Sequence, residues 1–183
     1  AVGAGTNSFA IAGGMGHTDA INNKVTLTGG TVTREIYGGL SDKGAATGNT
    51  VTITGGEIRD DVYGGFTKGD GDVTGNIVNI GDGAHDLAAG TRIDKSIYGG
   101  SNDGGSGTIS GNILNVKASA SAQNIRNFDT IKFHFTNTLS PKLTLSDTAG
   151  TTINRLRDIT VNGFSTIGTS TLIENANGIT VSD

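Results

Sequence analysis

The chain repeats one phrase three times, and this repetition limits its possible folds more than any other feature. The clearest copy spans residues 48–65, with a Gly-Asn pair, an alternating Val-Thr-Ile-Thr run, a Gly-Gly pair, a charged stretch and a final Tyr-Gly-Gly. The copies place their tyrosines at Tyr37, Tyr63 and Tyr98, in steps of 26 and 35 residues. Repeats of this length, built from strand and turn residues, are typical of stacked solenoids.

The alternating run in each copy predicts a strand with one apolar face. Val51 and Ile53 alternate with threonines, so the aliphatic side chains point to one side and the hydroxyl groups to the other. Equivalent pairs occur in the other copies, at Val25/Leu27, Val78/Ile80 and Leu114/Val116. We expect these pairs to stack on one another inside the solenoid.

A Gly-Asn pair introduces three of these strands, at Gly48-Asn49, Gly75-Asn76 and Gly111-Asn112. Both residue types tolerate left-handed backbone angles, so each pair predicts a corner of the chain. We call one turn of the solenoid a rung. Asparagines at the same corner of successive rungs can hydrogen-bond to one another, as amide side chains do in other stacked β-structures.

A second kind of segment predicts a bend. Its apolar residues lie four positions apart, as Val32/Ile36, Ile58/Val62 and Ile93/Ile97. In a straight strand the charged residue at the centre of each segment would also face inward, namely Arg34, Asp60 and Lys95. Burying an unpaired charge is costly. We therefore predict two short strands that meet at an exposed charged corner, with three faces per turn.

The residues of the repeat change after about residue 117, but apolar residues still recur at a regular spacing. The spacing of apolar residues in 125–133 recurs in 153–161, at an offset of 28, and Leu114, Leu143 and Leu172 are 29 apart. Near Leu172 the alternation of apolar and polar residues fails. A second apolar residue, Ile173, follows directly, and Glu174 occupies a position whose side chain should face inward. Four larger residues predict a wider core in this half, namely Phe128, Phe133, Phe135 and Phe164.

Together these patterns predict an all-β parallel β-helix of about six rungs, with roughly 26–36 residues per repeat. We expect a single β-solenoid over residues 1–183, divided into Gly/Thr-rich Tyr-Gly-Gly repeats (1–117) and divergent, more hydrophobic rungs (118–183). Ile11 to Gly14 predicts a degenerate first unit, with Ala12 in the tyrosine position. An antiparallel sandwich and a leucine-rich repeat are the competing folds; neither explains both the near-identical repeats and the lack of helix-forming blocks.

Composition excludes several classes of function. The net charge is −4 without a basic stripe, which argues against a nucleic-acid partner. Without cysteine the chain has no disulfides and no thiolate metal ligands. No apolar run approaches the ~18 residues that a membrane helix needs, so we expect no direct membrane insertion. Residues 1–5 do not resemble a signal peptide and residues 179–183 resemble a strand, so we expect a piece of a longer protein.

Tyr37, Tyr63 and Tyr98 are the candidate binding residues. They predict an aromatic ladder, which could stack on sugar rings or on a partner surface, or could only stabilise adjacent rungs. We expect no catalytic residues, cofactor or metal site. Carboxylates are numerous, and a polysaccharide hydrolase or lyase stays open as an alternative: Glu57, Asp60, Asp61, Asp70, Asp72, Asp82, Asp86 and Asp94.

Three other kinds of site have weaker support in the sequence. Residues 69–72 alternate glycine and aspartate, which suggests calcium, but no calcium-binding nonapeptide or EF-hand pattern is present. His17, His85 and His134 are far apart and fit no ligand spacing. The threonines of residues 50–54 suggest an ice-binding array, but asparagine replaces the central threonine on the next two rungs.

The repeat text resembles passenger regions of Gram-negative autotransporters, the type V secretion proteins. The resemblance covers residues 10–165 and rests on the Asn…Val-Thr-Ile-Thr-Gly-Gly and Val-Tyr-Gly-Gly phrases, and on the related wording of 112–133. It implies a right-handed β-helix that is exported to the cell surface, anchored by an outer-membrane barrel not present in this chain, and acts as a non-enzymatic adhesin or stalk. It also implies a host surface glycan or protein as partner. Separately, the exposed solenoid ends predict self-association.

Overall fold

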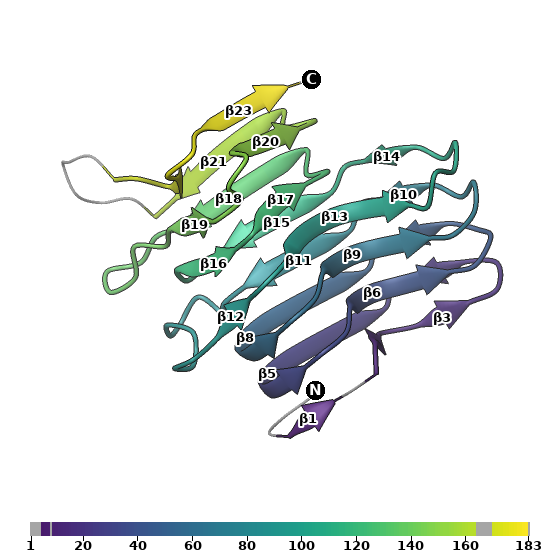
Figure 1. Cartoon of the computed structure of the whole chain (residues 1–183), viewed down its shortest axis with the longest axis horizontal. Coiled ribbons are helices and arrows are strands. Elements are labelled where there is room, and N and C mark those ends of the chain that lie inside the picture. The colour runs from purple at the N-terminus through teal and green to yellow at the C-terminus, as the bar shows by residue number, and fades with distance from the viewer. Residues whose placement is uncertain (1–4, 8, 164–169, 183) are drawn as a thin grey trace.

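The computed structural model describes residues 5–7, 9–163 and 170–182 and confirms the predicted fold, a right-handed parallel β-helix of about six rungs. The described residues contain strands and turns but no helix. In Figure 1 the strands of successive rungs lie side by side, and the two termini lie at opposite ends of the stack. Phe164, one of the predicted large core residues, lies outside the described residues.

The longest sheet runs through the stack in the order β1-β5-β8-β11-β15-β18-β21, and β12 pairs with the C-terminal end of β8. Its strands are β1 (Thr6–Asn7), β5 (Lys24–Val32), β8 (Thr50–Ile58), β11 (Ile77–Ile80), β12 (Arg92–Ile93), β15 (Ile113–Val116), β18 (Thr130–His134) and β21 (Asp158–Asn162). Every pairing between these strands is parallel, as a β-helix requires and an antiparallel sandwich does not.

A second sheet has the order β17-β13-β9-β6-β2, with β3 also paired to β6. Its strands are β2 (Ile11–Ala12), β3 (Met15–Gly16), β6 (Ile36–Ser41), β9 (Val62–Thr67), β13 (Ser96–Asn102) and β17 (Asn124–Arg126). Ile11 pairs with Ile36 and Ala12 with Tyr37, which confirms the degenerate first unit.

Four short sheets complete the turns. Their strands are β4 (Ala20–Ile21), β7 (Ala46–Thr47), β10 (Val73–Thr74), β14 (Ile109–Ser110), β16 (Ala120–Ala122), β19 (Leu143–Leu145), β20 (Thr151–Asn154), β22 (Ile173–Asn175) and β23 (Ile179–Ser182). They pair as β4-β7, β10-β14, β16-β19-β22 and β20-β23.

The core consists of the aliphatic residues that the alternation predicted. Val51 pairs with Val25 and Val78, and Ile53 pairs with Leu27 and Ile80. The next rung continues the same two columns, and their members on β8, β11 and β15 are completely buried. Because like side chains stack at the ~4.8 Å spacing of paired strands, two apolar columns run side by side through these rungs.

The predicted charged corner is present. β5 ends at Val32 and β6 begins at Ile36, both fully buried, while Arg34 between them is exposed. At the equivalent corners Lys95 is exposed and Asp60 is half-buried. The bend therefore keeps the charged side chains out of the core.

The predicted amide ladder is also present and is fully buried. Asn49, Asn76 and Asn112 each have 0% exposure. The Asn49 Nδ2 group donates to Asn76 Oδ1 (3.0 Å), and Asn76 Nδ2 donates to Asn112 Oδ1 (3.1 Å). The same oxygens accept backbone N–H groups of the preceding rung, and Asn23 extends the ladder at one end. We call Asn23, Asn49, Asn76 and Asn112 the asparagine ladder.

The glycines of Tyr-Gly-Gly make room for this ladder. A Cβ atom on Gly65 would lie 2.7 Å from both amide atoms of Asn76, and one on Gly64 would lie 2.5 Å from the Gly99 carbonyl oxygen of the next rung. Any larger side chain would push the rungs apart or displace the amide. The Gly-Asn and Tyr-Gly-Gly motifs thus act together, because the asparagine amide occupies the space that the glycines leave.

The 29-residue alignment of Leu114, Leu143 and Leu172 is wrong. Leu114 pairs with Ile131 in the long sheet, whereas Leu143 belongs to the β16-β19-β22 sheet and pairs with Ile173. Glu174 therefore does not face inward. It lies opposite Thr144, where its Oε1 accepts hydrogen bonds from Lys142 Nζ (2.8 Å) and Thr144 Oγ1 (2.9 Å).

The 28-residue offset is confirmed for part of its length. Ile131 pairs with Ile159 and Phe133 with Val161. Phe128 and Phe133 are completely buried, and Phe135 is nearly so. The second half therefore fills its core with aromatic rings.

Candidate functional site

The three predicted tyrosines come together as a continuous stack on the outside of the second sheet. Tyr37 and Tyr63 have ring centroids 5.1 Å apart at an interplanar angle of 11°, and Tyr63 and Tyr98 are 4.8 Å apart at 16°. Phe66 packs its ring edge-on against Tyr37 and Tyr63. Both faces of the Tyr63 ring are therefore covered by tyrosine, and only the ends of the stack have an outer face.

Burial and neighbouring carboxylates keep the tyrosine hydroxyl groups protonated. Burial, with a contribution from Glu35, Asp60 and Asp61, raises the pKa of Tyr37 to about 12. The same two causes raise the pKa of Tyr63, whose Oη donates to Asp61 Oδ2 at 3.2 Å, and the pKa of Tyr98. The stack therefore stays neutral to a higher pH than ordinary tyrosines, whose pKa is 10.0.

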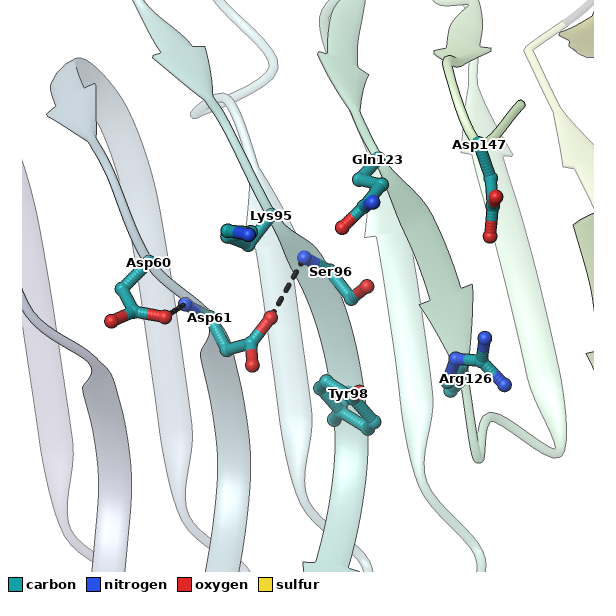
Figure 2. Close-up of a pocket in the computed structure, with 8 residues that line it drawn as sticks. All are labelled: Asp60, Asp61, Lys95, Ser96, Tyr98, Gln123, Arg126 and Asp147. Carbon is teal, nitrogen blue, oxygen red and sulfur yellow. Dashed lines mark hydrogen bonds between the residues drawn. The ribbon is translucent and has the colours of Figure 1, made fainter. Parts of the chain in front are cut away.

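The stack ends where a polar groove begins. Tyr98 pairs with Arg126 on β17, so an arginine takes the tyrosine position on the rung that follows Tyr98. The groove has a volume of about 530 Å³ and is lined by Asp60, Asp61, Lys95, Ser96, Tyr98, Gln123, Arg126 and Asp147. Figure 2 shows these side chains at the corners and strand ends of neighbouring rungs, with Tyr98 between Asp61 and Arg126. We call this the corner groove.

The carboxylates of the corner groove are held by the protein itself. Asp61 Oδ1 accepts the Ser96 N–H (2.9 Å), while Asp60 Oδ1 accepts the Asp61 N–H (3.0 Å). Asp147 accepts the buried Asn124 amide (2.8 Å) and the N–H of Ala149 (3.1 Å). Each carboxylate thereby fixes backbone or side-chain groups at the corner between two sheets.

Lys95 and Arg126, the two cations of the corner groove, are differently placed. Neither side chain forms an ion pair or hydrogen bond with another part of the chain that the structure describes. Lys95 is exposed and Arg126 is half-buried. Their N–H donors are available to a ligand in the groove.

Sequence reasoning found Asp60, Asp61, Lys95 and Tyr98 of this groove, but not as one site. It missed Gln123, Arg126 and Asp147, which belong to rungs whose sequences differ from the Tyr-Gly-Gly repeats. One signal was present in the sequence, because Asn124-Ile125-Arg126 follows the pattern of Ser96-Ile97-Tyr98. The structure aligns these two segments residue for residue.

The residues of the other candidate sites do not come together as a site. Asp70 and Asp72, from the glycine-aspartate loop, accept the N–H groups of Ser106 (2.9 Å) and Thr108 (2.8 Å) on the next rung. His17 and His85 lie on separate loops beside single aspartates, and His134 contacts Asn115. Within residues 5–7, 9–163 and 170–182, no three His, Asp or Glu side chains form a cluster that could hold a metal ion.

No helix in the described part of the chain is long and apolar enough to cross a membrane. Comparison of the chain with protein-family models, with curated proteins and with solved structures gave no match.

Proposed function

We propose that this chain is a non-enzymatic β-solenoid displayed outside a bacterial cell, acting as an adhesin or as the stalk that presents one. The proposal combines the resemblance to autotransporter passengers with the mechanics of the fold. Its partners would be a host surface glycan or protein, and a second copy of the chain at the solenoid ends. Its anchor would be an outer-membrane barrel outside this sequence.

One observation carries the proposal, namely the side-chain ladders that tie successive rungs together. The asparagine ladder runs inside the stack, and the stacked tyrosines run outside it. A third ladder follows the polar face of the long sheet, where Asn79 donates to Thr52 and Asn115 donates to Asn79. A stack tied at three positions resists bending and presents polar groups at a fixed spacing, which suits multivalent attachment.

The test is attachment of the folded chain to host cells. Beads coated with the chain should be retained on epithelial cells under flow more strongly than beads coated with a Gly64→Asp variant, whose side chain would meet the next rung. The beads should also bind members of a glycan or surface-protein array. Equal retention of both bead types, with no array binding, would overturn the adhesin proposal.

The carboxylates of the corner groove make polysaccharide cleavage the outcome to test alongside attachment. Acid catalysis of glycoside hydrolysis needs two carboxylates about 5–9.5 Å apart and able to exchange protons with the substrate. Here Asp61 is occupied by Ser96 and Tyr63, a structural role. Release of reducing ends from polysaccharides at a rate above buffer would replace the adhesin proposal with the enzyme alternative.

A further inference from the structure

The corner groove offers both donors and acceptors to a ligand, and they come from different residues. Lys95 and Arg126 contribute positively charged N–H groups without partners among the described residues. Gln123 adds an amide group to the same lining. Asp60 and Asp147 add carboxylate oxygens already oriented by the hydrogen bonds described above.

This combination narrows the chemistry of the ligand. A simple inorganic anion would use the two cations but would meet three carboxylates. A neutral sugar would use the carboxylates and the amide through its hydroxyl groups but would leave the cations unpaired. A ligand that carries hydroxyl donors and one anionic group satisfies both sets, because charge-assisted hydrogen bonds to lysine and arginine are the stronger ones.

The end of the tyrosine stack supplies an apolar surface for the same ligand. One face of the Tyr98 ring is covered by Tyr63, while the ring also lines the groove. The C–H face of a sugar ring packs well against such an aromatic surface. A volume of about 530 Å³ lies within the ~300–1,000 Å³ range of small-molecule sites.

We propose that the corner groove binds an acidic glycan, a sugar chain bearing carboxylate or sulfate groups. The anionic group lies between Lys95 and Arg126, the hydroxyl groups donate to Asp60 and Asp147, and one sugar ring packs on Tyr98. This inference rests on the proposed function, since it names the class of surface molecule that an adhesin of this kind would contact. It requires no bond to be made or broken.

The experiment is a calorimetric titration of the purified chain with three tetrasaccharides. Tetragalacturonate carries carboxylates, a sulfated galactose tetrasaccharide carries sulfates, and fully methyl-esterified tetragalacturonate has the same ring hydroxyl groups without charge. Saturable binding of at least one anionic sugar is expected, with the methyl ester at least about tenfold weaker. Whichever anionic sugar binds more tightly identifies the charged group.

Paired variants locate the binding. Lys95→Gln/Arg126→Gln should weaken binding at least about tenfold, because both charged donors are lost. The matched control Lys24→Gln/Arg34→Gln removes the same charge outside the groove lining and should change the affinity by less than about twofold. The Lys95 and Arg126 side chains are not in the core, so circular dichroism should show both double variants folded.

Three results would overturn the proposal: no binding of either anionic sugar, equal binding of the methyl ester, or equal losses in the two double variants. The bead assay separates this failure from failure of the proposed function. Attachment that survives Lys95→Gln/Arg126→Gln would reject the groove as the contact and leave the adhesin standing. Tight glycan binding without attachment to cells would support the groove and reject the adhesin.

Discussion

The two halves of this solenoid keep their rungs in register by different means. In residues 1–117 an asparagine ladder links four rungs, and the amides of Asn49 and Asn76 each have partners on both the preceding and the following rung. In the described part of residues 118–183 the core holds large rings such as Phe128 and Phe133, and Asn127 and Asn154 form a ladder of two members.

This difference explains where repeats are easy to recognise. If the register of a rung shifts by one residue, a buried amide loses several hydrogen bonds, and each buried group left without a partner is costly. The sequence around the asparagines must therefore repeat closely. An apolar side chain that slips can still pack against another apolar side chain. The second half therefore tolerates more sequence variation between rungs, and the spacing of its apolar residues predicts the structure less reliably.

The largest effect should come from the aromatic core of the second half. Phe133→Ala should lower the free energy of unfolding by about 3–5 kcal/mol, because a fully buried ring is lost and a cavity remains. Urea denaturation measures this loss. The exposed Phe9 provides the control, since Phe9→Ala should cost less than about 1 kcal/mol. Equal losses would contradict an aromatic core.

The asparagine ladder should come next. Asn76→Leu keeps the approximate volume but leaves the Ala46 carbonyl and the Asn49 N–H without their partner, at a cost of about 3 kcal/mol. Asn154→Leu, in the short half-buried ladder, should cost about 1 kcal/mol. If the two variants unfold at the same urea concentration, the halves do not differ as we describe.

The tyrosine stack should contribute less than either. Tyr63→Leu removes two stacked ring pairs, each worth about 0.5–1.5 kcal/mol, and should cost about 1–3 kcal/mol in thermal unfolding. Tyr98→Leu removes one pair and should cost about half as much. A loss for Tyr98→Leu greater than that for Tyr63→Leu would argue against stacking as the stabilising contact.

The same stack predicts a loss of stability at high pH. The folded-state pKa of Tyr37 is raised from 10.0 to about 12, so its stabilising contribution is complete below pH 10 and is lost as the pH rises through about 12. Tyr37→Phe, which has no ionisable hydroxyl group, should show a shallower decline over this interval. Unfolding curves of the two proteins at pH 9 to 12 that run parallel would contradict the raised pKa.

The smallest effect belongs to a surface ion pair of the second half. Lys142 and Glu174 approach to 2.8 Å, but both side chains are about 40% exposed. Glu174→Gln should therefore cost only about 0.2–1 kcal/mol, and less in high salt. A loss above about 2 kcal/mol in urea denaturation would indicate that Glu174 has the inward role that its sequence parity suggested.

Much of the fold could be predicted because its constraints are local. The aliphatic alternation, the Gly-Asn corners and the charge of Arg34 each follow from properties of a few adjacent residues. The place of Leu143 could not be predicted, because the segment between β18 and β19 puts it in the β16-β19-β22 sheet, where it pairs with Ala120 and Ile173 and not with Leu114. The corner groove could not be predicted as one site, since Asp60, Lys95 and Asp147 come together only when successive rungs stack.

Native-state hydrogen exchange tests the central claim most directly, that side-chain ladders make the first half a stiff rod. The backbone amides of β8, β11 and β15 should exchange slowest in the molecule, together with the buried side-chain amides of Asn49 and Asn76. The amides of β18 and β21 should exchange faster. Slower exchange in β18 and β21 than in β8 and β11 would contradict the claim and assign the rigidity to the aromatic core instead.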